Sequence, residues 1–302
     1  MTKKKGPTAG SGGQGKRRLQ GRGPTPRAEE RPGHPAARRA AAARAALAQR
    51  SADDTVAGRN AVVEALQAEV PATSLVVAKG LDFDSRVAEA LRLARARALP
   101  VNERPRAELD RLAGGTHHQG LLLAAAPYSY LEPEDLVTRA LDRGDPPLIV
   151  ALDGVTDPHN LGAIIRSAAA FGAHGVLIPV RRSARMTPGA WKSSAGTAAR
   201  LPVARATNLR RALDGYADRG LTIAGLTAHA AGARELADLD GAGPLVLVAG
   251  AERVGLSRLV REACQVEVAI AAAGGAESLN VSVAVGVTLY AVAEQRRAAG
   301  RL

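Results

Sequence analysis

The chain has 302 residues, 46% of them hydrophobic, so it is long enough for about two domains with their own cores. One cysteine, Cys264, excludes internal disulfides and a multi-cysteine zinc site, and this usage is typical of a cytoplasmic protein. No uncharged apolar run approaches the roughly 18 residues of a membrane-spanning helix, so no membrane association is expected.

Residues 1–53 are predicted to form a disordered basic tail. Residues 1–50 carry 13 Lys and Arg against Glu29 and Glu30, which gives +11 of the chain's +12. Because the segment also lacks Phe, Tyr, Trp, Ile and Val, it cannot bury enough apolar surface to offset the entropy of ordering. Two interpretations remain open for this tail: a non-specific attraction to nucleic acid, or a solvated segment with no defined partner.

Residues 54–127 alternate between helix and strand, a pattern that predicts a small α/β domain. Helices are expected at 58–67, 85–98 and 106–114, and strands at 73–79, 99–103 and 118–126. Residues 128–147 are rich in proline and acidic residues, and we expect them to be a linker that contains one helix.

Residues 148–302 resume the alternation with stronger strands. They are expected at 148–155, 174–180, 201–206, 221–227, 244–250 and 266–270, with helices at 161–171, 208–219, 257–263 and 279–297. Several of the strands are continuous apolar runs, as in a parallel sheet that is buried on both faces. The pattern predicts an open α/β domain, in which a ligand sits beyond the carboxyl ends of the strands.

Polar side chains follow three of these strands. After the first strand, Asn160 is expected to cap a helix, with Arg166 near the same face almost two turns later. Without further evidence, Asn160 can also be interpreted as a plain helix cap and Arg166 as a surface residue without a function. After the fifth strand, Gly250 allows a close approach of the backbone, and Glu252 is the acid of the following turn.

The third segment approaches the last helix through Gly274 and Gly275 and carries Ser278 and Asn280 at the head of that helix. These are more polar groups than a cap requires. We expect the three segments to converge on one cleft. No G-x-G-x-x-G motif follows the first strand, so a dinucleotide-binding site is poorly supported.

In order, the three segments resemble the three motifs of the SpoU/TrmH branch of the SPOUT RNA methyltransferases. The matching residues are Asn160, Arg166 and Phe171–Gly172, then Gly250, Glu252 and Gly255–Ser257, then Ser278–Ser282. The likeness covers residues 148–296. Residues 55–126 resemble, through GRNAVVEAL and THHQGLLL, the ribosomal-protein-L30e-like substrate-binding domain that precedes this catalytic domain.

The resemblance implies a parallel-sheet SPOUT domain with a C-terminal trefoil knot that binds S-adenosylmethionine, and a homodimer that completes the active site. It implies methylation of the ribose 2′-oxygen of a guanosine in large-subunit rRNA, at the peptidyl-transferase centre. It assigns five residues to catalysis and three to the cofactor: Asn160, Arg166, Glu252, Ser278 and Asn280 for catalysis, and Gly250, Ile270 and Leu279 for S-adenosylmethionine. No metal is implied.

Within that scheme, Arg166 is expected to clamp a phosphate or to stabilise the developing alkoxide, because arginine is almost always protonated and is a poor base. Asn160 and Glu252 would orient Arg166 and the ribose. Ser278 and Asn280 would bind substrate and fix the loop.

Two alternatives stay open. The methyl acceptor could be a ribose in tRNA or elsewhere in rRNA. The chain could also be an RNA-binding scaffold without catalysis, since Ala271–Ala272 stand where the family usually has Pro-Met. His117 and His118 are expected to be exposed or to contact RNA, because no third metal ligand is near. Trp191 is expected in a core, with an RNA contact as the alternative.

Overall fold

The structure, a computed structural model, describes residues 35, 36, 38, 54–228, 232–252, 254–271 and 278–301. Almost all of the expected basic tail therefore lies outside the described residues. Residues 51–302 form one compact unit, and residues 1–50 are grouped separately from it. None of the described helices has the length and apolar character that crossing a membrane requires.

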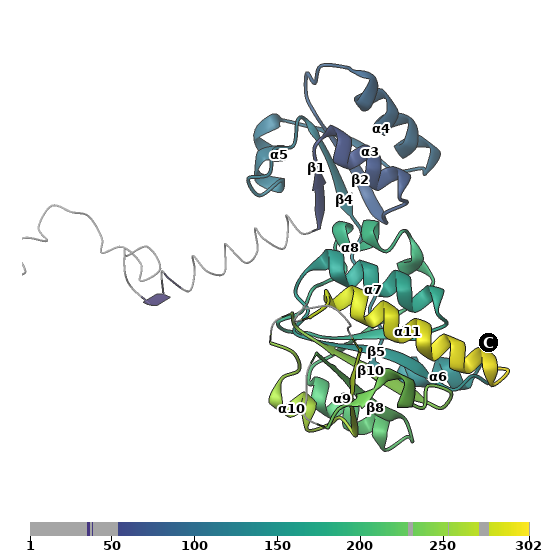
Figure 1. Cartoon of the computed structure of the whole chain (residues 1–302). Helices are drawn as coiled ribbons and strands as arrows, with labels where there is room; N and C mark the ends of the chain where they lie inside the picture. Colours follow the sequence, from purple (N-terminus) through teal and green to yellow (C-terminus); the bar gives the residue numbers. More distant parts are fainter. Residues whose placement is uncertain are drawn as a thin grey trace, which may run out of the picture. The chain divides into compact units, whose positions relative to one another are not determined.

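The first folded part is a small mixed sheet with helices around it (Figure 1). Within the described residues its strand order is β1-β4-β2-β3, where β4 runs antiparallel to both neighbours and β2 is parallel to β3. The bounds are β1 Thr55–Ala57, α3 Arg59–Gln67, β2 Ala72–Ala78, α4 Ser85–Ala96, β3 Val101–Arg104, α5 Arg106–Leu112 and β4 Leu121–Ala125. The predicted alternation is confirmed here. The three-residue β1 was not predicted, because it is too short to show a periodicity.

His118 corrects one expectation, since it is buried rather than exposed. Only 4% of its surface is accessible. Its Nδ1 accepts the backbone N–H of Gly120 at 3.0 Å, and its Nε2 lies 2.9 Å from Asp110 Oδ1. Both ring nitrogens therefore hold the turn before β4, which is a structural role. His117 is exposed, as expected.

The segment 128–147 contains one helix, α6 (Pro133–Leu141), and this helix packs on the larger sheet. Leu136 and Val137 lie in one core cluster with Ile149 of the first strand of that sheet. The Tyr130 hydroxyl accepts the backbone N–H of Met186 at 2.8 Å. The segment is therefore fixed to the second folded part over most of its length.

The second part is a parallel sheet with the order β7-β6-β5-β10-β8-β11-β9 in the residues described. Its strands are β5 Leu148–Asp153, β6 Gly175–Pro179, β7 Val203–Ala206, β8 Thr222–Thr227, β9 Arg234–Glu235, β10 Leu245–Gly250 and β11 Val266–Ala269. Its helices are α7 Pro158–Ala170, α8 Pro188–Ser193, α9 Leu209–Ala217, α10 Arg258–Arg261 and α11 Val281–Ala298, with short 3-10 turns at Thr197–Ala199 and Leu236–Asp238. All six predicted strands are present, and the two-residue edge strand β9 is additional.

Both faces of this sheet are covered, as the continuous apolar strands predicted. Along β5, Leu148, Val150 and Leu152 contribute to the core cluster that contains α7, α8 and α11 residues. The alternate residues Ile149 and Ala151 contribute to the cluster with α6, α9 and α10 residues. The result is a three-layer α/β sandwich (Figure 1). Trp191 lies in the first of these cores with 9% of its surface exposed.

Candidate active site

Asn160 does not cap its helix, which corrects the expectation from the sequence. The cap of α7 is Asp157, whose carboxylate accepts the N–H of His159 at 2.8 Å, and Pro158 occupies the first helical position, where its missing N–H costs nothing. Asn160 is therefore in the first turn with its amide free for another use. Its Nδ2 donates to Glu252 Oε1 at 3.2 Å.

Glu252 is presented by a tight turn at the end of β10. Ala251 and Gly255 exchange two backbone hydrogen bonds of 3.1 and 2.8 Å, and Gly255 has a φ of +71°. A Cβ at Gly250 would lie 2.2 Å from the Gly255 carbonyl carbon, so glycine is required there for the loop to fold back. The close approach expected at Gly250 is thus, in the first place, an approach to its own loop.

Asp153 contributes to this arrangement and was missed in the sequence. It is the last residue of β5, and its Oδ2 accepts the backbone N–H of Ser257 at 2.7 Å. This bond ties the end of the Glu252 loop to the neighbouring strand. The signal available was a carboxylate at the end of an apolar strand, directly before a glycine.

Asn280 is both a helix cap and a member of the polar cluster. As the cap of α11, its Oδ1 accepts the N–H groups of Ser282 and Val283 at 2.9 and 3.4 Å. Its Nδ2 donates to Glu252 Oε1 at 2.8 Å and to Asn160 Oδ1 at 3.1 Å. The backbone and the side-chain networks therefore constrain the same amide.

The Asn160–Glu252–Asn280 cluster joins three segments that are far apart in the chain, beyond the carboxyl ends of β5, β10 and β11. Two amide N–H groups converge on one carboxylate oxygen, Oε1, and hydrogen bonds to a charged acceptor are the strong kind. The second carboxylate oxygen has no hydrogen-bond partner among the described residues. Ser278 is exposed beside the cluster and makes no hydrogen bond to another described residue.

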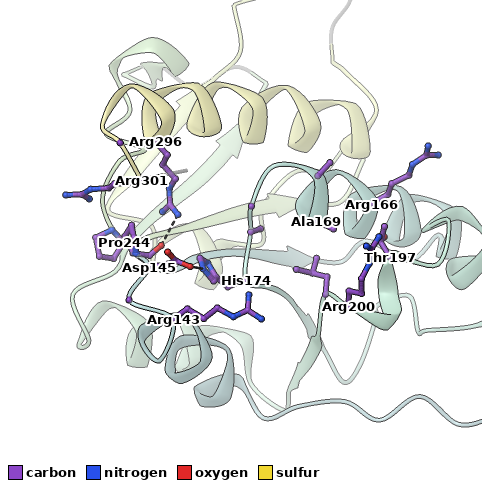
Figure 2. Close-up of a pocket in the computed structure, with 17 residues that line it drawn as sticks. Arg143, Asp145, Arg166, Ala169, His174, Thr197, Arg200, Pro244, Arg296 and Arg301 are labelled. Atoms are coloured by element: carbon purple, nitrogen blue, oxygen red, sulfur yellow. Dashed lines mark hydrogen bonds and ion pairs between the residues drawn. The ribbon is translucent and has the colours of Figure 1, made fainter.

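Arg166 lies apart from this cluster. Six residues along a helix rotate by about 600°, which leaves Arg166 a third of a turn away from the face of Asn160. The expected shared face was therefore wrong. The Arg166 side chain is exposed and lies at the rim of a separate cavity that α7 helps to line, with its guanidinium directed outward (Figure 2). Its neighbour Ser167 faces Gly286 of α11, with 3.5 Å between the Ser167 Oγ and a Cβ built at Gly286.

The residues expected to hold the cofactor lie at or after the ends of β10 and β11, with Gly250 shortly before Glu252 and Leu279 directly before Asn280. Ile270 is half-buried at the end of β11, and Leu279 has 41% of its surface exposed. Val254, in the Glu252 loop, is 78% exposed. Exposed apolar side chains beside a polar cluster at the strand ends fit a ligand with an apolar adenine and a charged amino-acid part. Ala271 is exposed next to Ile270, and Ala272 lies outside the described residues.

The comparisons with known proteins agree with this geometry. Residues 147–290 match the model of the SpoU rRNA Methylase family, and residues 55–131 match that of the RNA 2′-O ribose methyltransferase substrate-binding domain. An "Uncharacterized tRNA/rRNA methyltransferase" of Mycobacterium sp. (strain KMS) is 56% identical over 299 residues, covering 97% of this chain and 95% of the relative.

Two solved structures are similar as well. The SpoU methyltransferase AviRb from Streptomyces viridochromogenes, in complex with AdoMet, has a TM-score of 0.58 and 26% identity, covering 80% of this chain and 90% of its own. An RNA 2′-O ribose methyltransferase has a TM-score of 0.54 and 27% identity, covering 80% and 88%.

The fold is a parallel α/β sandwich with a polar cluster beyond its strand ends, and its relatives are RNA methyltransferases. Together these findings define an RNA methyltransferase that uses S-adenosylmethionine. The chain belongs to the SpoU rRNA methylase family.

Proposed function

We propose that this enzyme methylates the ribose 2′-oxygen of a guanosine in large-subunit rRNA, in the peptidyl-transferase region. The Asn160–Glu252–Asn280 cluster is the observation that carries the proposal, because it supplies a fixed carboxylate in a chain of this family. The match of residues 55–131 to a 2′-O-ribose substrate-binding domain supports the choice of atom. The guanosine and its location rest on the resemblance to the two-domain rRNA enzymes.

In this proposal the two folded parts divide the work. Residues 54–127 select the RNA, residues 128–147 join the parts, and residues 148–302 carry the chemistry. The C-terminal segment forms the trefoil knot of SPOUT enzymes. The bond from Asn280 to the Glu252 loop supports that arrangement, because it fastens the returning chain to the end of β10. Attraction of RNA by the basic tail and a cytoplasmic location fit this role.

Glu252 orients the ribose hydroxyl. When bound, S-adenosylmethionine supplies a methyl group on a positive sulfonium, which is already a good electrophile. The chain must therefore place a weakly nucleophilic hydroxyl in line and help to remove its proton. Since both amides donate to Oε1, the second carboxylate oxygen is left to accept the ribose hydroxyl. Ser278 would position the ribose next to Asn280.

Arg166 supplies positive charge to the same reaction from a second copy of the chain. A homodimer is supported by an apolar stripe along α11 whose members are exposed: Val283 50%, Val287 40% and Tyr290 54%. Their spacing keeps them on one helix face. Arg166 lies on α7 beside this helix, so a two-fold pairing through the stripe would bring it toward the partner's cluster. There it would stabilise the alkoxide or hold a phosphate.

Gly250, Ile270 and Leu279 would hold the cofactor through backbone groups and apolar surface. A tRNA substrate is the second candidate, favoured by the name of the mycobacterial relatives, tRNA/rRNA methyltransferase. A scaffold without catalysis is not proposed, because the chain belongs to a family of methyltransferases and its polar cluster is intact despite Ala271–Ala272.

The test is a map of ribose 2′-O-methyl groups on large-subunit rRNA and tRNA from a deletion strain. We expect one guanosine of the peptidyl-transferase region to lose its methyl group, wild-type protein to restore it, and Glu252→Gln to fail. A lost methyl group in tRNA would select the second candidate. An unchanged map, together with cofactor binding by the purified protein, would contradict both candidates.

A further inference from the structure

A large cavity lies at the opposite edge of the large sheet, away from the polar cluster. Its lining includes residues that directly precede three strands: Pro146 before β5, His174 before β6 and Pro244 before β10. It has a volume of about 1210 Å³. The arginines that line it come from different elements of the fold (Figure 2): Arg143, Arg166, Arg200, Arg296 and Arg301.

Arg296 is a structural member of this set. It is 2% exposed, and its guanidinium donates to four backbone carbonyls at distances of 2.8 to 3.2 Å. Those carbonyls belong to Gly241 and Gly243, before β10, and to Pro146 and Pro147, before β5. Arg296 therefore clamps two loops, and little of its donor capacity faces the cavity.

Among the described residues that line the cavity, Asp145 is the only carboxylate, and it is already engaged. Its Oδ2 lies 3.5 Å from Nε2 of His174, whose Nδ1 accepts the N–H of Leu148 at 3.1 Å. With Nδ1 as an acceptor, the hydrogen of a neutral imidazole is on Nε2 and points to Asp145. Burial lowers the pKa of His174, which keeps the ring neutral.

The other four arginines form no ion pair with the side chain of a described residue. Arg143, Arg166 and Arg200 are exposed and form no ion pair with a described residue, and Arg301 donates to the carbonyl of Ala242. Elsewhere on the described surface, arginines such as Arg92 and Arg258 face a carboxylate on the same helix.

Helix ends do not neutralise the cavity either. The helices α6, α7 and α11 all end at it, because Gly144, Gly172 and Gly300 are among its lining residues. Each carboxyl end is equivalent to about −0.5 charge, or roughly −1.5 for three. Adding Asp145 brings the negative side to about −2.5, against five arginines. An excess of about 2.5 positive charges remains.

We propose that this arginine basin, made of Arg143, Arg166, Arg200 and Arg301, binds backbone phosphates of the RNA on one side of the methylated nucleotide. The proposal rests on the function proposed above, since Arg166 is the link between the basin and the reaction. In this proposal, a strand whose target ribose meets Arg166 places its neighbouring phosphates at the other three arginines, which line the same cavity.

The lining favours a nucleic-acid backbone over a compact ligand. The cavity exceeds the roughly 300–1,000 Å³ of typical small-molecule sites, and its positive charge is spread over separate elements. No Phe, Tyr or Trp is among the described lining residues, so the cavity lacks the aromatic side chains on which bases usually stack. Such contacts position a strand without reading its sequence. A small free polyphosphate carries the same phosphate groups, so the experiment must distinguish it from an RNA backbone as the ligand.

The test compares full-length Arg143→Ala/Arg200→Ala with full-length Arg211→Ala/Arg234→Ala. The control pair is exposed, lies outside the basin and removes the same charge. Because the basic tail is present in both, its contribution to RNA affinity cancels. Thermal unfolding should be equal in the two variants, since all four side chains are exposed.

Binding of a protein-free large-subunit rRNA transcript is measured across a salt series, apart from methylation. We expect the basin variant to lose about 100-fold in affinity at low salt, roughly tenfold for each arginine. The slope of log K against log salt should fall by about 1.4 to 1.8 for two lost phosphate contacts. Under turnover, KM for the RNA should rise while kcat and cofactor affinity stay near wild type.

Equal RNA affinity and salt slope in the two variants would overturn the proposal. So would micromolar binding of inorganic tripolyphosphate that the basin substitutions abolish while RNA affinity is unchanged, because the basin would then serve a free anion. If the transcript is bound with the predicted loss but never methylated, the basin stands and the proposed target fails. If the transcript is methylated and the basin variant binds it normally, the proposed target stands and the basin proposal fails.

Discussion

Asn280 performs two tasks with two different atoms, and Asn280→Asp separates them. The Oδ1 atom caps α11, and the Nδ2 atom donates to Glu252. Aspartate keeps a capping oxygen and removes the donor, whereas Asn280→Ala removes both. We expect the aspartate variant to be nearly as stable as the wild type and much slower in methylation. We expect the alanine variant to be both less stable and slower.

The magnitudes follow from the contacts. Asp and Asn are nearly equivalent caps, and replacing either by Ala costs about 1 kcal/mol. Charge repulsion between the introduced carboxylate and Glu252 would cost about 1 kcal/mol at an exposed site, while the helix dipole returns roughly 0.3–1 kcal/mol. Losing the hydrogen bond to the Glu252 carboxylate costs about 1.5–3 kcal/mol of positioning, or roughly a 10- to 100-fold loss of rate.

The assays are thermal unfolding, cofactor titration and single-turnover methylation. A loss of 1 kcal/mol lowers Tm by roughly 2–4 °C for a folded unit of this size. The alanine variant should show that loss, and the aspartate variant should stay within about 2 °C of wild type. Cofactor affinity should change little in both. An aspartate variant that methylates at the wild-type rate would refute the assignment, because the amide donor would then be irrelevant.

Three further predictions concern other parts of the fold. Gly250→Ala should cost about 1–3 kcal/mol or more in urea unfolding, because its Cβ would meet the Gly255 backbone at 2.2 Å; Gly215→Ala in α9, with nothing within 4 Å, should not destabilise. Arg166→Lys should restore little of the rate lost in Arg166→Ala if the planar fork matters, and recovery of most of it would show that only the charge is needed. Burial lowers the pKa of His174, so the unfolded chain takes up a proton that the folded chain resists. The free energy of unfolding should therefore be constant above about pH 6.5 and fall as the pH drops below it, by at most about 1.4 kcal/mol per unit. His174→Asn should flatten that decline.

Much of the large sheet could be predicted because its strands are buried on both faces. Continuous apolar runs such as Leu148–Leu152 leave no alternative to a covered parallel sheet, and all of the predicted strands were found. The failures were short or local. The strands β1 and β9 have too few residues to show a period. His118 stands beside its exposed neighbour in sequence, but only the fold shows that its ring is turned inward.

The meeting of the three polar segments was predictable from the sequence, whereas the position of Arg166 was not. Polar residues after three apolar strands indicated a cleft, and Asn160, Glu252 and Asn280 do meet. Arg166 was placed with them because sequence distance was taken for proximity, although its angle around α7 directs it elsewhere. Asp153 was overlooked because a carboxylate at a strand end has no periodicity to mark it.

The charge of the cluster gives a reason for a second copy of the chain, and this can be tested by mixing subunits. If Glu252 orients the hydroxyl as proposed, its charge would oppose a developing alkoxide, and an arginine close to it in the transition state would offset that repulsion. If Arg166 comes from the partner, a heterodimer of Arg166→Ala and Glu252→Gln chains contains one site with both groups intact. Half of the dimers in a random mixture are heterodimers, so re-associated chains should regain about a quarter of the wild-type activity. If Arg166 acts within its own chain, every site in that mixture lacks one group, and activity stays at the level of the separate variants. Failure to regain activity, with heterodimers demonstrated by differently tagged chains, would contradict a shared site and place the missing positive charge within a single chain.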